Sequence, residues 1–244
     1  MTETQGRSRR RRASHSMDSV ITEAVALLDE AGESGLTFRA LAERLGGGVA
    51  SIYWYVSSKE ELLDRASDHV VGNVLERTAH LAHSEGSPRN SDPINDMREI
   101  AISLFDAVAD RPWLGAYFMR DTSLQPNALT LFDRLGQQAM RLDLTRRQRF
   151  HAVSAVMGFV IGTAADLGQE IPKEVADGSV SREDYVEHFA DQWRGLDANT
   201  FPYLQHIVEE FASHDDSEQF RAGLDLLLAG IRLQAEGQAG SATS

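Results

Sequence analysis

The chain of 244 residues contains no cysteine. Disulfides, thiolate-bound metal ions and cysteine nucleophiles are therefore excluded, and a reducing compartment is permitted. The sequence also has no uninterrupted apolar run near the 18 residues that a membrane-spanning helix needs, and no apolar stretch follows its basic beginning, as a secretory signal requires. Glycine and proline, 19 and 6 residues, are too few for a disordered or fibrous chain. We therefore expect a folded cytoplasmic protein with a sizeable core.

The short motifs that carry enzyme chemistry in many families are missing as well. The chain contains no glycine-rich phosphate loop, no G-x-S-x-G segment and no H-E-x-x-H metal motif. His80 and His83 lie three residues apart on a predicted helix, a spacing at which two side chains could bind one metal ion. His69 lies earlier on the same helix, and no obvious third ligand accompanies the pair. We interpret these histidines as surface residues and expect no catalytic residue, no cofactor and no bound metal.

Charge is distributed unevenly along the chain, whose net charge is −13. Residues 1–65 carry nine Lys and Arg against ten Asp and Glu, whereas residues 66–244 carry 15 against 27. Five arginines lie between Arg7 and Arg12 with no acid among them. Such a run is either a solvated tail or a flexible arm that follows DNA phosphates or enters a minor groove. We expect residues 1–16 to form a basic flexible arm.

Apolar residues recur at three- and four-residue steps along most of the chain, which predicts helices and no convincing strand. Ser58 with Glu61 and Thr145 with Gln148 are typical of capping boxes, and Asp92-Pro93 marks another helix start. The fold is therefore predicted to be all-α. Loops are expected at residues 84–91 and 168–180, and helices at residues 17–33, 37–45, 49–55, 58 to about 83, 93–110, 113–120, 126–142, 145–167, 182–193, 200–212 and 218–234.

Three glycines, Gly46 to Gly48, separate the second and third of these helices. Helix, tight turn and short helix together form a unit with which many proteins read DNA. A steep turn needs one residue with positive φ, which glycine adopts without steric cost, and Gly46 fits that position. Gly47 and Gly48 exceed what the turn requires. We expect the third helix to be loosely anchored, so that Gly47→Val raises both stability and DNA affinity.

The segments L-T-F-R-A-L-A-E-R-L-G and S-I-Y-W-Y-V-S-S-K-E-E-L-L resemble the DNA-binding domain of the TetR family of transcriptional regulators. Further on, S-A-V-M-G-F-V-I-G-T-A-A-D and Q-F-R-A-G-L-D-L-L-L-A-G-I resemble the main dimerisation helix and the last helix of its tetracycline-repressor-like subgroup. The resemblance implies an N-terminal three-helix helix-turn-helix domain before a larger helical ligand-binding and dimerisation domain. We expect these domains at residues 17–62 and 63–236, and a flexible tail at residues 237–244.

The resemblance also implies which residues contact DNA. Phosphate contacts are expected from Thr37, Arg39 and Lys59, base-edge contacts from Val49, Ala50 and Ser51, and backbone or thymine-methyl contacts from Tyr53 and Tyr55. Core packing is expected instead for Ile52, Val56 and, in part, Trp54. One departure is Gly47, which stands where family members usually place an apolar residue. Because residues 48–50 also carry no long polar side chain, we expect direct base readout to be sparse.

A short recognition helix rarely discriminates enough by itself, so such proteins bind two half-sites as symmetric dimers. Ser154, Gly158 and Gly162 form a row at four-residue spacing on the helix at 145–167, where another helix can come close. With the helix at 218–234, it suits a four-helix bundle between two subunits. We therefore expect a homodimer on double-stranded DNA with a palindromic operator, and an intramolecular bundle remains the alternative.

Aromatic and methionine side chains cluster between the long helices, and the resemblance implies an inducer pocket there. The expected ligand-binding residues are Phe105, Trp113, Tyr117, Phe118, Met157, Phe159 and Asp166. For any one of them, core packing is the competing interpretation. Tyr117 stands where the tetracycline repressor has a metal-binding histidine, so tetracycline with magnesium is not favoured. The expected inducer is a largely hydrophobic, multi-ring molecule bound without a required metal.

These patterns predict a DNA-binding transcriptional repressor that a small hydrophobic ligand releases from its operator. The alternative is a small-molecule-binding protein or enzyme that carries a helix-turn-helix. Loss of DNA binding with retained turnover after changes at Arg39 and Tyr53 would favour the alternative.

Overall fold

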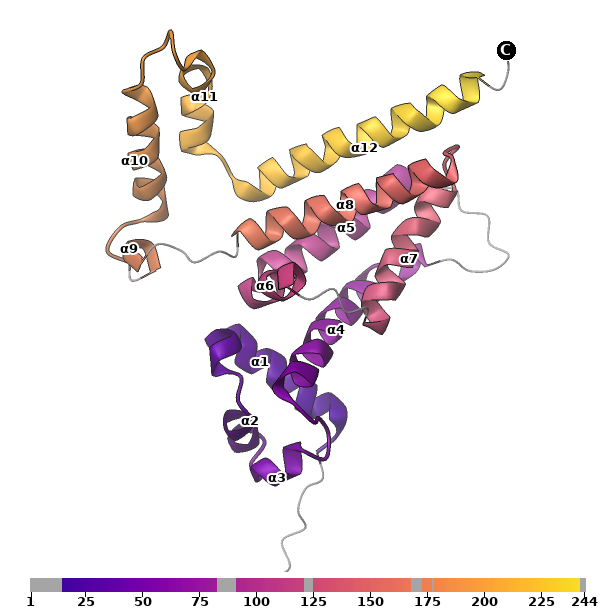
Figure 1. Cartoon of the computed structure of the whole chain (residues 1–244), viewed down its shortest axis with the longest axis vertical. Coiled ribbons are helices and arrows are strands. Elements are labelled where there is room, and N and C mark those ends of the chain that lie inside the picture. Colours follow the sequence, from indigo (N-terminus) through magenta and orange to yellow (C-terminus); the bar gives the residue numbers. More distant parts are fainter. Residues whose placement is uncertain (1–14, 83–90, 121–124, 168–172, 177, 242–244) are drawn as a thin grey trace, which may run out of the picture. The chain divides into compact units, whose positions relative to one another are not determined.

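The computed structural model describes residues 15–82, 91–120, 125–167, 173–176 and 178–241. Within these ranges the regular structure is helical and no strand is present, as the sequence predicted (Figure 1). The helices are α1 (Met17–Gly35), α2 (Phe38–Arg44), α3 (Val49–Ile52), α4 (Lys59–Arg77), the 3-10 helix η1 (Ala79–Leu81), α5 (Pro93–Ala109), α6 (Pro112–Arg120), α7 (Pro126–Met140), α8 (Arg146–Leu167), α9 (Lys173–Ala176), α10 (Arg182–Arg194), α11 (Pro202–Ser213) and α12 (Asp216–Ser241).

The chain forms two compact units that divide between His69 and Val70, inside α4. In the first unit, α1 buries one face through Val20, Ala24 and Leu28, and α2 packs against both α1 and α3. Each helix contributes apolar residues at helical spacing, which explains why this short segment has a core of its own.

The second unit is centred on α8, which packs against α5, α6 and α7 (Figure 1). The buried face of α8 consists of small and β-branched residues at three- and four-residue steps, namely Ala152, Val153, Val156, Val160 and Ala164. Helix α12 lies along α8 and α5. Helices α10 and α11 pack against each other, with the Trp193 and Phe211 rings stacked at 4.2 Å between centroids.

Helix starts agree well with the sequence signals. Thr145 and Gln148 form the expected capping box, since the Thr145 Oγ1 accepts from the Gln148 amide at 3.3 Å and the Gln148 Oε1 accepts from the Thr145 amide at 2.9 Å. The Asp92 carboxylate caps α5 by accepting from the Ile94 amide at 3.0 Å. A further capping box, Ser16 with Ser19 at the start of α1, was not anticipated because it contains no Glu or Gln.

Helix ends differ more from expectation. Helix α4 ends at Arg77 and is followed by the separate turn η1, where the sequence indicated one helix to about residue 83. Helix α12 continues to Ser241, beyond the expected end at residue 234, and α9 lies in a segment expected to be a loop. The arginine run at residues 7–12, His83, and most of the expected loop at 84–91 lie outside the described residues.

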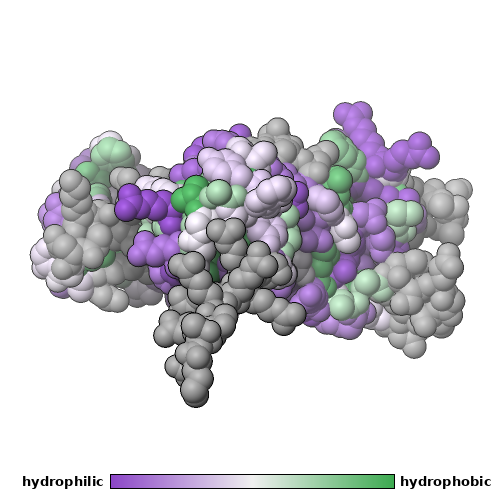
Figure 2. All heavy atoms as spheres, turned by 90° about the horizontal axis from the view of Figure 1, so that it is seen from below, coloured by the Kyte–Doolittle hydropathy of each residue, from purple (hydrophilic) through white to green (hydrophobic). Residues whose placement is uncertain are grey.

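One face of the described part of the molecule is mainly polar. In Figure 2 purple and white residues cover most of the coloured face, with green ones scattered among them. Helix α8 is long and apolar enough, by length and composition alone, to cross a membrane. Its apolar residues have another explanation, because one face is buried against α5, α6 and α7.

Candidate nucleic-acid interface

The turn between α2 and α3 has the geometry that the three glycines predicted. Gly46 has φ +66°, and its amide and that of Gly47 donate to Glu43 O at 3.0 Å and to Ala42 O at 2.8 Å, closing the end of α2. Gly48 is the N-cap of α3 with an extended backbone, φ −100° and ψ 152°. Of the three, only Gly46 has positive φ, so the assignment of the turn to this residue is confirmed.

Helix α3 is a single turn, Val49–Ile52, shorter than the expected segment 49–55. The Ser51 amide and hydroxyl both donate to Gly48 O, at 2.9 and 2.5 Å, which fixes this turn. Ile52 and Val56, four residues apart, are buried as expected. The expectation that Trp54 is partly in the core is wrong, because its side chain is 88% exposed. The helix has ended before Trp54, and the intervening turn directs the indole outward.

Several residues expected to contact DNA are exposed on this unit. Arg39 and Ala50 are exposed, and Val49 and Tyr53 are 38% and 60% exposed. The Tyr53 ring meets the Phe38 ring edge-on at 4.8 Å, which orients it without burying it. Thr37 is exposed and caps α2, since its Oγ1 accepts from the Ala40 amide at 3.1 Å.

Ser51, Tyr55 and Lys59 are more enclosed, and each of them makes a hydrogen bond within the unit. The Tyr55 hydroxyl donates to the His15 carbonyl just before α1, and the Lys59 Nζ donates to Glu33 O near the end of α1 at 2.6 Å. A cation beside the carbonyl end of a helix is stabilised by the helix dipole. Tyr55 therefore fixes the start of α1 to the segment after α3, and Lys59 fixes the end of α1 to the start of α4. An ammonium group keeps two further N–H donors for a phosphate.

Two carboxylate contacts shape the charge of this unit. Arg44 pairs with Glu30 at 2.6 Å and Glu23 at 3.0 Å, so its charge is balanced internally and holds α2 against α1. These hydrogen bonds raise the pKa of Arg44 and lower that of Glu30. Arg39, on the same helix, has no carboxylate partner within 4 Å among the described residues. Arg39 is thus the cation of α2 that is available to an anionic partner.

The start of α4 is held by a modified version of the expected capping box. The Ser58 Oγ accepts from the Glu61 amide at 3.1 Å, as predicted. The Glu61 carboxylate instead accepts from the hydroxyl and the amide of Ser57, both at 2.7 Å. These bonds, with Arg65, lower the pKa of Glu61 to about 2. The ordered start of α4 follows directly on the segment that carries Tyr53 and Tyr55.

The residues expected to bind a ligand belong to several packed groups. Phe105 of α5 and Phe159 of α8 both stack on Phe220 of α12, with centroids at 3.6 and 5.5 Å. A Cβ at Gly223 would lie 2.6 Å from the Phe159 Cζ, so a glycine here admits the ring. Phe220 lies in the helix at 218–234 that was expected to join the bundle between subunits, and it was not among the expected ligand residues.

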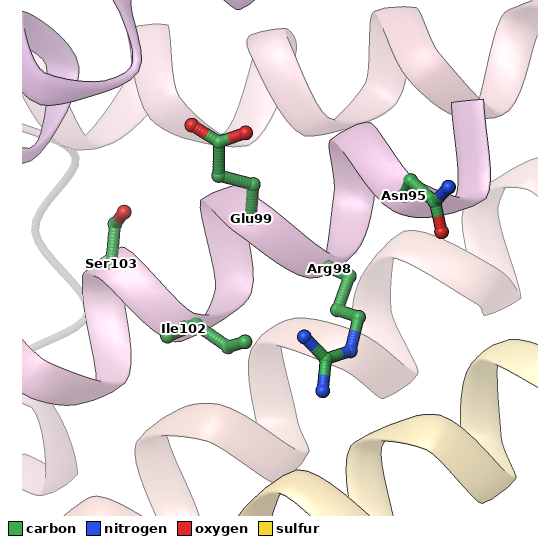
Figure 3. Close-up of a pocket in the computed structure, with 5 residues that line it drawn as sticks. All are labelled: Asn95, Arg98, Glu99, Ile102 and Ser103. Atoms are coloured by element: carbon green, nitrogen blue, oxygen red, sulfur yellow. The ribbon is translucent and has the colours of Figure 1, made fainter. Parts of the chain in front are cut away.

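The other expected ligand residues are arranged differently. Trp113 and Tyr117 of α6 are buried, Phe118 and Met157 are half-buried, and Asp166 is exposed. Two surface grooves are defined elsewhere, of about 310 Å³ on α5 (Figure 3) and about 290 Å³ between α8 and α12. Neither groove is lined by an expected ligand residue, and a ligand site at these aromatics stays a prediction.

The histidines singled out from the sequence are only partly described. The His80 Nε2 lies 3.0 Å from the Glu99 Oε1, and His83 lies outside the described ranges. In the part of the chain that the structure describes, no three His, Asp or Glu side chains are grouped closely enough to hold a metal ion.

Helices α8 and α12 expose small and apolar residues on their outer faces. Gly158 and Gly162 have open space where a Cβ would lie. Leu226, Leu233 and Phe150 are 77%, 70% and 64% exposed. The groove between the two helices is lined by Gln148, His151, Ala152, Ala155, Leu226, Leu227, Gly230, Ile231 and Gln234. An apolar surface with close-approach glycines is typical of a protein–protein contact.

An exposed one-turn recognition helix, set by a glycine turn in a small helical unit and followed by a larger helical unit, defines a helix-turn-helix regulator of transcription. Comparison with known protein families agrees. Residues 20–66 match the bacterial regulatory proteins of the tetR family, and residues 85–235 match the tetracyclin repressor-like C-terminal domain. The chain belongs to the tetR family of bacterial regulatory proteins.

Individual relatives and solved structures give the same result. The chain is 32% identical over 148 residues to an HTH-type transcriptional regulator of Saccharopolyspora erythraea, covering 61% of this chain and 59% of that protein. It is 24% identical to the class D tetracycline repressor of Escherichia coli, over 89% of each chain. The transcriptional regulator SCO7222 of Streptomyces coelicolor has a TM-score of 0.75 and 32% identity, covering 91% of this chain and 99% of the other.

Proposed function

We propose that this regulator represses transcription in the cytoplasm as a homodimer on a palindromic operator, and that a small hydrophobic ligand releases it. The observation that carries the proposal is the exposed surface formed by Arg39, Val49, Ala50 and Tyr53 beside the hydrogen-bonded glycine turn. This surface offers a cation to phosphate and apolar groups to thymine methyls. It has few long polar side chains that could make bidentate hydrogen bonds to base edges. Shape readout therefore contributes much of the specificity.

The homodimer is proposed to form through the outer faces of α8 and α12. Gly158 and Gly162 allow another helix to come close, and the exposed Leu226 and Leu233 gain most by being covered. A twofold axis places the same surface of both copies in contact. Two recognition helices about 34–36 Å apart then meet successive major grooves of one DNA face.

The ligand is proposed to be a largely hydrophobic, multi-ring molecule, neutral or weakly cationic, that binds near the Phe105, Phe159 and Phe220 ring stack without a required metal. Phe105 and Phe220 of the ring stack are buried and Phe159 is half-buried, so the stack offers an apolar wall at Phe159. Tyr117 and Asp166 lie on the two helices α6 and α8 that pack together. A protein of similar fold, ActR of Streptomyces coelicolor, has been solved in complex with actinorhodin, with 23% identity and a TM-score of 0.74. We therefore propose actinorhodin as a first probe molecule.

The experiment that tests the DNA proposal is selection of bound duplexes from the genomic DNA beside the gene, followed by footprinting of the bound site. We expect a protected palindrome with half-sites about one helical turn apart. Arg39→Ala should reduce the slope of log affinity against log salt by about one unit, whereas Arg146→Ala on α8, also exposed, is the matched control. Equal slopes for both variants would place the phosphate contact elsewhere. A chain that protects no site would contradict the proposal.

A further inference from the structure

His15 lies directly before the N-cap of α1 and contacts the recognition segment in two ways. Its backbone carbonyl accepts from the hydroxyl of Tyr55, 40 residues further along the chain. Its imidazole lies beside the glycine turn, because a Cβ built at Gly47 would be 3.5 Å from the His15 Nε2. The His15 side chain is half-buried. The residue is therefore held against both the turn before α3 and the segment after it.

Gly47 is the position at which this contact depends on a missing side chain. The same Cβ would lie 3.1 Å from the Ser51 Oγ, so the serine hydroxyl and the imidazole both lie next to one exposed point of the turn. An apolar residue at this position, which the family resemblance leads one to expect, would extend from the Cβ into the space around these two groups. The φ of Gly47 is not positive, so the turn itself does not require this glycine. The close approach of the imidazole provides a reason for it.

The imidazole adds a kind of group that the recognition helix lacks. Residues 48–50 carry no long polar side chain, and the Ser51 hydroxyl already donates to Gly48 O at 2.5 Å. Among the described residues, the ring nitrogens of His15 have no hydrogen-bond or ion-pair partner. A histidine ring carries one N–H donor when neutral and two when protonated. The imidazole is thus a polar donor beside the recognition helix that is available to an anionic partner.

The charge of this donor depends on pH in a range where its surroundings do not change. The ionisable groups on the elements joined to the contact are Asp18 in the first turn of α1, Glu43 and Arg44 at the end of α2, and Tyr55. Arg44 is already paired with two carboxylates. Carboxyl, guanidinium and phenol groups in general keep their charge between pH 6 and 8, whereas histidine side chains gain a proton there. A phosphate close to an imidazole favours the protonated form.

We propose that His15 is a further DNA-contacting residue: its imidazole, beside Gly47, donates to a backbone phosphate next to the bases that α3 meets, and this contact strengthens as the pH falls from 8 to 6. The proposal rests on the proposed function, because it concerns the operator complex. The Tyr55 bond fixes the backbone of His15 before DNA binds, which reduces the entropy cost of the contact. A phosphate contact at this place fixes the register of α3 on the duplex without reading a base.

The test uses the full chain and the duplex that the wild-type protein selects from genomic DNA. Residues 1–69 contain a second histidine, His69 on α4, which is also half-buried, so His69→Ala is the matched control. We expect His15→Ala to weaken binding about tenfold at pH 6 and to reduce the slope of log affinity against log salt by about one unit. Both differences should be smaller at pH 8. His69→Ala should keep the affinity, the slope and the pH dependence of the wild type.

A second variant separates a DNA contact from a structural role. His15→Lys carries a cation at both pH values, so it should keep the wild-type salt slope at pH 6 and bind with less dependence on pH. The carbonyl that accepts from Tyr55 remains in both variants, so thermal unfolding should match the wild type. Wild-type affinity and slope for His15→Ala, or an equal loss at both pH values with an unchanged slope, overturns the inference alone. A wild-type protein that selects no duplex overturns the proposed function as well.

Discussion

Gly46 and Gly47 are adjacent, yet only the first has the left-handed backbone, with φ +66°. Alanine at a positive φ costs about 1–2 kcal/mol, so Gly46→Ala should lower the free energy of unfolding by about that amount. Gly47→Ala should leave stability near the wild-type value, because it restricts the unfolded chain at a position without positive φ, while its Cβ, 3.1 Å from the Ser51 Oγ, requires a small shift of that side chain. Urea unfolding of both variants measures the difference, and equal losses would contradict the assignment of the turn.

The sequence led us to expect that Gly47→Val raises stability and DNA affinity together. A Cβ at this position lies 3.1 Å from the Ser51 Oγ, and that hydroxyl already donates to Gly48 O. An alanine at this position requires the Ser51 side chain to shift by a few tenths of an ångström. The branched valine adds two further methyl groups beside the recognition turn. Alanine is therefore the better substitution for testing whether this turn is loosely anchored.

Tyr53 and Tyr55 differ in what their hydroxyls do. The Tyr55 hydroxyl donates to the His15 carbonyl and is partly buried, whereas the Tyr53 side chain is 60% exposed. Tyr55→Phe should lower the unfolding free energy by about 0.5–1.5 kcal/mol. Tyr53→Phe should leave stability unchanged and weaken DNA binding. The two variants are compared by thermal unfolding and by duplex titration, and a reversed pattern would exchange the two assigned roles.

At the scale of single helices, α4 contains a glycine that contacts α7. A Cβ at Gly72 would lie 2.9 Å from the Asn127 Nδ2, the movable end of a side chain. Gly72→Ala gains about 0.8–1 kcal/mol of helix propensity and requires the Asn127 amide to shift. We expect net stabilisation, smaller than that of Gly136→Ala in α7, where the space is open. Urea midpoints decide this, and a destabilised Gly72→Ala would show that Asn127 is fixed.

Helices α5 and α12 are joined by ion pairs that depend on pH. Hydrogen bonds from Arg232 and Arg98 lower the pKa of Asp92 and Asp225 below the ordinary value of 3.8. A lowered pKa in the folded state means that the stabilisation is present above pH 3.8 and is lost as the pH falls through the folded-state pKa. The side chains of each pair are about one-third exposed or more, so water screens the pair and its contribution to stability is small.

Asp225→Asn isolates one of these pairs. The wild type should be more stable than the variant at pH 6. The difference should shrink as the pH falls below 3.8 and disappear below the folded-state pKa of Asp225, because the folded wild type then lacks the charge as well. Urea unfolding at both pH values measures it, with Asp191→Asn on α10, an exposed position, as a variant outside the α5–α12 contact. A difference that persists at low pH would indicate a packing effect.

Helix starts were more predictable than helix ends. The caps at Asp92, Thr145 and Ser58 depend on residues within four positions, so their signals are local. The end of α4 depends on Arg134 and Gln138, more than 50 residues away in the sequence. Contacts of that kind leave no local pattern, which explains why one continuous helix was expected where α4 and η1 are separate.

For the molecule as a whole, dimerisation is the central prediction. Gly162→Glu and Leu226→Asp each place a charge on the outer faces of α8 and α12, where burial of an unpaired charge is costly. Both positions are open or exposed in a single chain, so the variants should fold as monomers. Gly136→Glu on α7, also in open space, should remain dimeric. Sedimentation distinguishes them, and intact dimers for Gly162→Glu and Leu226→Asp would rule out this interface.

The structure of the DNA-binding unit could be predicted from the sequence more completely than that of the ligand region. Its turn, caps and buried positions follow from residues close together, and Gly46, Ile52 and Val56 lie as expected. The ring stack of Phe105, Phe159 and Phe220 unites three helices separated by more than 50 residues. The sequence shows that these aromatic residues are present but not which rings contact each other. Sequence alone therefore could not separate core packing from a ligand pocket at these residues.

The exposed indole of Trp54 provides an intrinsic fluorescence signal from the recognition segment. Of the three tryptophans, Trp113 is 6% exposed and Trp193 is stacked on Phe211, whereas Trp54 is 88% exposed. A dissolved collisional quencher such as iodide should therefore extinguish mainly the red-shifted emission of Trp54. A duplex bound over this segment should shield it, so occupancy of the DNA site can be followed in solution without any label, while the emission of the buried Trp113 and the half-buried Trp193 reports on the other unit.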